Sequence, residues 1–160
     1  MYKSQLDLPE AVRRQSWAIL QGRLSDSLDM EAQLKQAHWN VRGRDFYQLH
    51  RLFDELHGEI EELVDIIAER LTALGGVADG RVKMTARATS LSEYPADAVL
   101  GDAHLKALAR ALGEFGAATR RDIDAAAAFG DADTADVFTQ VSRTVDKQLW
   151  FVEAHLQAER

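Results

Sequence analysis

Five residues between positions 38 and 69 carry side chains of the kinds that bind metal ions in proteins. They are His38, His50, Asp54, Asp65 and Glu69, which supply imidazole nitrogen and carboxylate oxygen but no sulfur. This ligand set suits Fe(II), and it also suits Mn(II) or Zn(II). The residues therefore predict a metal centre whose ion is not fixed by its ligands alone.

The spacing of four of these residues places them on one stripe of a helix. An α-helix turns by about 100° per residue, so residues four and eleven positions apart lie near one another around the axis. With His50 at zero, Asp54, Asp65 and Glu69 fall at roughly 40°, 60° and 100°, and an apolar seam centres on roughly 250°. The stripe therefore faces something other than its own core. The seam contains Leu52, Phe53, Leu56, Ile60, Leu63, Ile67 and Leu71.

Distances along the axis decide how the stripe could hold an ion. Asp54 and Asp65 are about 16 Å apart at 1.5 Å per residue, whereas ligands lie within about 2–2.5 Å of an ion. A second copy of the helix, antiparallel across a twofold axis, would bring Asp65 and Glu69 to His50 and Asp54 of its partner. Gly58 lies beside the centre of this pairing, where a missing side chain lets two backbones approach.

A charged helix face also has a simpler explanation, which is contact with solvent. His50, His57 and Glu61 fit a solvated face as well as they fit a site. A lone histidine, such as His57 or His104, is usually a surface residue and nothing more. Both are therefore left out of the predicted centre.

Helices are expected to carry nearly all of the chain, because alanine and leucine are abundant and β-branched alternation is nearly absent. Capping boxes are predicted at Asp7 with Glu10 and at Asp45 with Gln48. Glycines mark the helix ends. The expected helices run from Asp7 to Trp39, from Asp45 to Leu74, from Asp102 to Phe129, and from Asp131 or Asp133 to the C-terminus.

The segment from Gly75 to Gly101 is the one long connection, and it contains Gly80, Pro95 and several Ser and Thr residues. Such a length fits a crossover between helices that are not hairpin neighbours, with a short helix expected at residues 94–99. Four long helices with one long crossover predict an all-α, ferritin-like four-helix bundle. One domain is expected over residues 1–160.

Composition limits the classes of function. The formal net charge is −7, which disfavours nonspecific nucleic-acid binding but attracts cations. The absence of cysteine excludes a disulfide framework and a thiolate metal site, and it fits a reducing cytosol. Neither a signal peptide nor a membrane-spanning apolar run is expected. We therefore expect a cytoplasmic protein.

The stretch AHWNVRGRDFYQLHRLFDELHGEIEELVDIIAERLTALGG resembles the signature region of the Dps family, the mini-ferritins named for DNA binding in starved cells. TADVFTQVSRTVDKQLWFVEAHLQ is similar to the family's last helix. The resemblance implies a hollow homo-dodecamer that oxidises Fe(II), preferably with hydrogen peroxide, and stores a ferric oxide core. It implies a di-iron-type ferroxidase centre with His38, His50 and Asp54 from one subunit and Asp65 and Glu69 from its partner. Trp39 resembles the family's aromatic residue beside the centre, where it packs or intercepts radicals.

Departures from the family leave alternatives open. Relatives that bind DNA carry basic terminal tails, and this chain has neither, so we expect weak or absent DNA binding at physiological salt. The alternatives are a nucleoid-compaction protein with little enzymatic role, a Zn- or Mn-binding member with little iron turnover, and a helical oligomer without metal. Asp122, Asp124 and Asp131 are candidates for the family's acidic pores, or for a solvated helix end and an N-cap.

Overall fold

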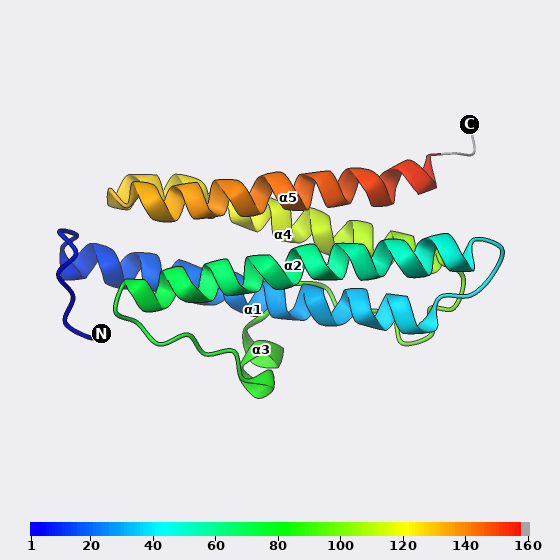
Figure 1. The fold of residues 1–160 in the computed structure, drawn as a ribbon, viewed down its shortest axis with the longest axis horizontal. Helices are drawn as coiled ribbons and strands as arrows, with labels where there is room; N and C mark the ends of the chain where they lie inside the picture. The colour runs from blue at the N-terminus through cyan, green and yellow to red at the C-terminus, as the bar shows by residue number, and fades with distance from the viewer. Residues whose placement is uncertain (158–160) are drawn as a thin grey trace.

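Four long helices lie side by side and a short fifth helix lies outside them (Figure 1). The computed structural model describes residues 1–157. None of the helices in that range is both long and apolar enough to cross a membrane. The arrangement confirms the predicted all-α four-helix bundle. Its helices are α1 (Glu10–Asn40), α2 (Phe46–Ala73), α3 (Val82–Ala88), α4 (Gly101–Phe129) and α5 (Ala132–Leu156).

The core lies where the apolar seams of the long helices meet. Phe53 of α2, Phe115 of α4 and Phe138 of α5 are all fully buried, and burying one such side chain contributes about 1.5–3 kcal/mol. The seam of α2 is as predicted, except that Leu49 is buried and Leu52 is only partly so. Because this seam faces inward, the charged stripe of α2 is left on the outside of the bundle.

Two helix N-termini differ from prediction. α1 begins at Glu10 instead of Asp7, and its N-cap is Pro9, which has ψ 145° and cannot cap with a side chain. The side chain of Asp45, before α2, also makes no capping hydrogen bond. Its ψ of 22° is far from the extended conformation that aims an N-cap side chain at the next amides. Both predicted capping boxes are therefore wrong.

The predicted cap of the last helix is confirmed. Asp131 Oδ1 accepts a hydrogen bond from the Thr134 amide at 3.1 Å, and Arg70 of α2 donates to the same oxygen at 2.6 Å. Asp131 is only 1% exposed. It therefore caps α5 and joins α5 to α2, which leaves it no open surface for lining a pore.

The short helix lies earlier in the crossover than expected. α3 covers Val82–Ala88, whereas residues 95–98 form a turn in which the Ala98 amide donates to the Pro95 carbonyl at 3.3 Å. Lys, Met, Arg and Ala favour helix in α3. After Pro95 the chain must instead extend, because the Val99 carbonyl accepts a hydrogen bond from the Arg42 amide at 2.9 Å.

Carboxylates of α1 and α4 fix the second half of the crossover. Asp26 is fully buried and accepts hydrogen bonds from the amide and hydroxyl of Ser90 at 2.7 and 2.9 Å. Glu114 accepts from the amide and hydroxyl of Ser92 at 2.8 and 2.6 Å. Bonds to ionised groups are about twice as strong as neutral ones. These contacts set the position of Tyr94, which lies two residues after Ser92.

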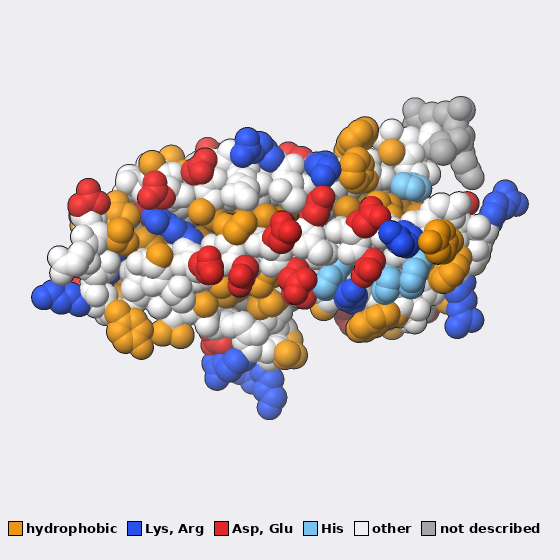
Figure 2. All heavy atoms as spheres, viewed as in Figure 1, with side chains coloured by type: hydrophobic (Ala, Val, Ile, Leu, Met, Phe, Trp, Pro, Cys, Tyr) orange, Lys and Arg blue, Asp and Glu red, His pale blue; other side chains and the backbone are white. Residues whose placement is uncertain are grey.

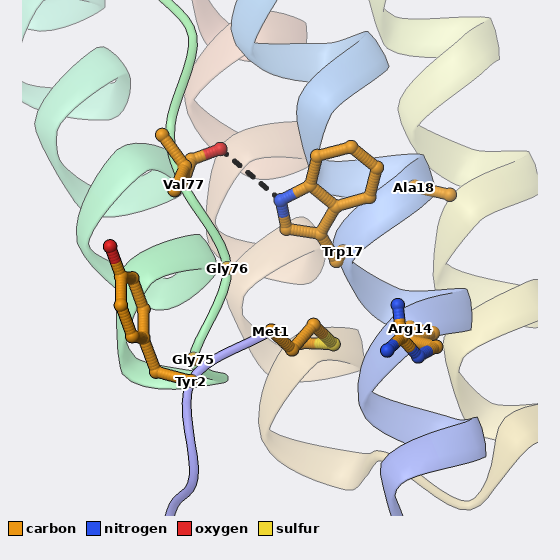
Figure 3. Close-up of a pocket in the computed structure, with 8 residues that line it drawn as sticks. All are labelled: Met1, Tyr2, Arg14, Trp17, Ala18, Gly75, Gly76 and Val77. Carbon is orange, nitrogen blue, oxygen red and sulfur yellow. Dashed lines mark hydrogen bonds between the residues drawn. The ribbon is translucent and has the colours of Figure 1, made fainter.

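The N-terminal segment is held against the end of α2. The Tyr2 amide donates to the Gly75 carbonyl at 2.6 Å. Gly75 has φ +88°, and a Cβ on Gly76 would lie 2.0 Å from Trp17 Cδ1, so both positions require glycine. Figure 3 shows Trp17 beside this turn, where its Nε1–H donates to the Val77 carbonyl at 3.2 Å. The segment around Tyr2 is therefore attached to the bundle.

Candidate metal centre

His38, near the end of α1, and His50, near the start of α2, form a stacked pair. Their ring centroids are 3.8 Å apart and the ring planes differ by 19°. His38 Nδ1 lies 2.8 Å from the His50 carbonyl oxygen, and His50 Nδ1 lies 2.8 Å from the His38 carbonyl oxygen. A ring nitrogen that faces a carbonyl must carry a proton, so each Nδ1–H donates, and in the neutral ring the lone pair is on Nε2. Each neutral ring is therefore oriented to bind metal through Nε2.

The turn between α1 and α2 brings the two rings together. Val41 is buried and Gly43 adopts φ +112°, so the chain reverses within residues 41–45. The ring of Phe46 then lies with its centroid 5.2 Å from that of His50. Antiparallel packing of the two helices places His38 opposite His50.

Asp54 lies one helical turn after His50 and close to His38. Its Oδ1 is 4.0 Å from His38 Nδ1 and accepts a hydrogen bond from Lys35 Nζ at 2.5 Å. The hydrogen bond from Lys35 is the main reason that the pKa of Asp54 is lowered, and the charge of Lys35 adds to it. The carboxylate is therefore kept ionised beside the two imidazoles. Lys35 was missed from the sequence, although it lies one turn before His38.

Asp65 and Glu69 lie farther along α2 and are exposed. Asp65 is eleven residues beyond Asp54, which corresponds to about 16 Å along the helix axis. Within residues 1–157 no three His, Asp or Glu side chains lie close enough together to hold one ion. One chain therefore places His38 against His50 and close to Asp54 without closing the three around one ion, and it does not bring Asp65 and Glu69 to them.

The acidic part of the stripe borders a shallow hollow on the outer face of α2. Glu31, Gly58, Glu61, Glu62 and Asp65 contribute to its lining. A Cβ on Gly58 would meet nothing within 4 Å, so packing in this chain does not require glycine there. Figure 2 shows acidic side chains along this face, with the histidines toward one end. The face offers oxygen ligands that are open to a second molecule.

Trp39 is 70% exposed, so its own chain does not pack it into the core. Phe46, Tyr47, Leu100 and Trp150 are also exposed. Large exposed apolar side chains mark surfaces that contact other molecules. The packing predicted for Trp39 would therefore have to involve another subunit.

Two of the three histidines outside the predicted centre, His57 and His104, have side-chain partners. His57 Nε2 lies 3.2 Å from Glu31 Oε1. His104 is only 1% exposed and bonds to Tyr94, so its prediction as a surface residue is wrong. It lies four residues before the buried Leu108, and this spacing could have shown that it faces the core.

Comparison with known proteins places this chain in a family. Residues 18–160 match the model of the ferritin-like domain. The chain is 39% identical over 156 residues to the DNA protection during starvation protein of Agrobacterium fabrum, covering 98% of this chain and 96% of that protein. It is 34% identical over 143 residues to DNA protection during starvation protein 1 of Deinococcus radiodurans, covering 88% and 68%.

Solved structures agree with these relatives. DpsC from Streptomyces coelicolor superposes with a TM-score of 0.93 at 33% identity, covering 97% of this chain and 91% of that one. Dps from Mycobacterium smegmatis superposes with a TM-score of 0.92 at 26% identity, covering 97% and 94%. The chain therefore belongs to the ferritin-like proteins and, among them, to the Dps family.

Proposed function

We propose that this protein oxidises and stores iron at ferroxidase centres shared between two subunits. One half of each centre consists of His38, His50 and Asp54, and the other half consists of Asp65 and Glu69 of the partner subunit. The proposal rests on the stacked imidazoles of His38 and His50, whose Nε2 atoms are not used by the fold, and on the ionised carboxylate of Asp54 beside them. The remaining acidic ligands of the stripe lie too far away in the same chain.

The residues of the site fit Fe(II) as the substrate. Donation of both Nδ1–H groups to carbonyls fixes the rings and makes Nε2 a better donor. Lys35 must release Asp54 when Fe(II) arrives. We assign one ion to His38 with the partner's Asp65 and Glu69, and a second, more weakly held ion to His50 and Asp54. Zn(II) or Mn(II) could occupy the same ligands.

Hydrogen peroxide is the proposed oxidant, with oxygen as the alternative. Two Fe(II) ions each give one electron, and peroxide takes both electrons with two protons to form two water molecules. Because both electrons pass together, no hydroxyl radical is released. The Fe(III) ions then hydrolyse and move to a mineral core, for which exposed carboxylates such as Glu62 are candidate nucleation points.

A dodecamer built from twofold dimers is the proposed assembly. The open space at Gly58 and the exposed aromatic side chains of Trp39 and Trp150 support contact between subunits. The relatives are named for DNA protection. With a net charge of −7, we propose that this protein protects DNA chiefly by removing iron and peroxide, and that it binds DNA weakly.

Replacing His50 and Asp54 together with alanine tests the function. We expect peroxide-driven oxidation of Fe(II) to slow at least about 10-fold, since even indirect support of metal ligands is worth 10–100-fold. A matched double variant, His155→Ala with Glu153→Ala, removes the same side-chain types from an exposed part of α5 and should retain the rate. Wild-type turnover in the His50 and Asp54 variant, with the assembly intact, would refute the assigned centre.

A further inference from the structure

Tyr94 of the crossover and His104 of α4 form a hydrogen-bonded pair that the metal centre does not use. Tyr94 Oη lies 2.5 Å from His104 Nδ1. The other ring nitrogen, Nε2, is buried and has no hydrogen-bond partner within residues 1–157, although the backbone carbonyls of Asn40 and Val99 act on the ring. A phenol O–H is more acidic than a neutral imidazole N–H and is therefore the better donor, which places the ring proton on Nε2. His104 Nδ1 therefore accepts, and the Tyr94 hydroxyl donates.

Both groups are neutral as they meet. Burial raises the pKa of the Tyr94 hydroxyl. Burial also lowers the pKa of His104, against the opposing effect of the carbonyls of Val99 and Asn40. An oxidised phenol is a strong acid, so an electron leaves tyrosine easily only when the proton has an acceptor. His104 Nδ1 is such an acceptor, already in contact.

The pair lies between the surface and the helix of the metal centre. A hollow of about 270 Å³ borders Tyr94, with Gln33, Lys106 and Arg110 in its lining. On the other side the His104 ring faces Phe53, with centroids 6.3 Å apart. Phe53 directly precedes Asp54 in α2. Small oxidants can therefore approach the phenol from outside, while an aromatic ring connects the pair to α2.

We propose that Tyr94 and His104 form a one-electron redox site that consumes hydroxyl radicals, in addition to the proposed iron oxidation. The Tyr94 Oη–H bond breaks, the electron reduces the hydroxyl radical to hydroxide, and the proton passes to His104 Nδ1. An electron from Fe(II), which becomes Fe(III), then returns to Tyr94, and the proton returns to Oη. One radical and one Fe(II) are consumed, and the protein is unchanged.

A purely structural role would leave Tyr94 as an anchor of the crossover, alongside the hydrogen bonds from Ser92 to Glu114. Anchoring requires the hydrogen bond but no radical. The two roles are therefore separated by detecting a tyrosyl radical and identifying its position.

Iron-free protein is oxidised with azide radicals from pulse radiolysis, and the product is followed by phenoxyl absorption and freeze-quench EPR. We expect a tyrosyl radical in the wild type and loss of most of the signal in Tyr94→Phe. Tyr2→Phe and Tyr47→Phe are the matched controls and should retain the signal, because within residues 1–157 only the Tyr94 hydroxyl is hydrogen-bonded to a side chain that can take its proton. His104→Gln removes the proton acceptor and should shorten the lifetime of the radical.

An undiminished signal in Tyr94→Phe would overturn the proposal. If that variant does not fold, high-field EPR of the wild type identifies the radical instead. A hydrogen bond to the phenoxyl oxygen shifts the g tensor of the radical, and in D₂O it adds a coupling to an exchangeable deuterium. A radical without this hydrogen bond would also overturn it. The experiment contains no iron, so the His50→Ala and Asp54→Ala double variant should form the same radical whether or not the ferroxidase proposal holds.

Discussion

His38 and His50 each donate a hydrogen bond to the backbone carbonyl of the other, at the same distance of 2.8 Å. The exchange fixes the tautomer of both rings without using any other side chain. It also ties the end of α1 to the start of α2, so the ligand geometry depends on the turn between these helices. The fold itself therefore orients the Nε2 atoms of His38 and His50 as two nitrogen donors for a metal site at this position.

Lys35 should set the acid limit of iron oxidation. Lys35→Met removes the hydrogen bond that lowers the pKa of Asp54, so this pKa rises toward its usual value. A carboxylate must be ionised to bind metal, and the acid limb of the pH–rate profile should therefore move to higher pH. Arg51→Met, which removes an exposed partner of Glu55 on the same helix, should not move it. Stopped-flow oxidation measured across pH tests this, and an unmoved limb in Lys35→Met would contradict it.

Gly58 should be required by assembly and not by the fold of one chain. The Cβ that Gly58→Leu adds meets no neighbour in its own chain, and the change improves helix propensity by about 1 kcal/mol, yet it should block close approach of two α2 helices. We expect smaller species by native mass spectrometry. Gly22→Leu, in α1, also has open space at its Cβ and serves as the control. A full assembly of Gly58→Leu would show that the α2 backbones do not meet there.

Asp131 should contribute strongly to stability. Asp131→Ala removes the cap of α5 and leaves Arg70 without its buried partner, so the free energy of unfolding should fall by about 2–4 kcal/mol. Burial alone would raise the pKa of Asp131, but hydrogen bonds from neighbouring groups and the charge of Arg70 outweigh it and lower this pKa. The stabilisation is therefore present above the usual aspartate pKa and is lost as pH falls through the lowered value.

Chemical denaturation of wild type, Asp131→Ala and Asp131→Asn measures this contribution. Asparagine still caps but carries no charge, so its loss of stability should be smaller and should not depend on pH near the aspartate pKa. Equal stability of wild type and Asp131→Ala at neutral pH would show that the buried pair contributes nothing.

DNA binding should be weak. The net charge is −7, and Tyr2 holds the N-terminal segment to Gly75. We expect no compact complexes in a gel-shift assay at neutral pH and ~150 mM salt, where phosphate contacts are strongly screened. Lowering the salt should restore some retention if Lys83 and Arg87, exposed on α3, supply the contacts. Compact complexes at the higher salt would contradict the proposal of weak binding.

The features of the fold that depend on local pattern could be predicted from the sequence. The spacing of Phe53, Leu56 and Ile60 defines the buried face of α2, and the left-handed glycines Gly75 and Gly130 mark two helix ends. Helix periodicity also places Asp54 and Asp65 on one stripe and too far apart for one ion. These conclusions need only the geometry of a single helix.

The features that depend on contacts between distant segments could not be predicted from the sequence. Lys35 reaches Asp54 only because α1 and α2 pack antiparallel, and Tyr94 meets His104 only because carboxylates of α1 and α4 fix the crossover. The extended chain after Pro95, where a short helix was predicted, likewise follows from the pairing of Val99 with Arg42. The joining of the two halves of the metal centre depends on a second chain and remains a prediction.

Complementation between two inactive variants tests the shared centre most directly. One variant carries His50→Ala with Asp54→Ala, and the other carries Asp65→Ala with Glu69→Ala. Each alone should oxidise Fe(II) slowly. In a mixed dimer one of the two sites combines intact halves from both chains, so random co-assembly should restore about a quarter of wild-type sites. Activity of co-assembled protein that stays at the level of the separate variants would contradict a centre shared between subunits.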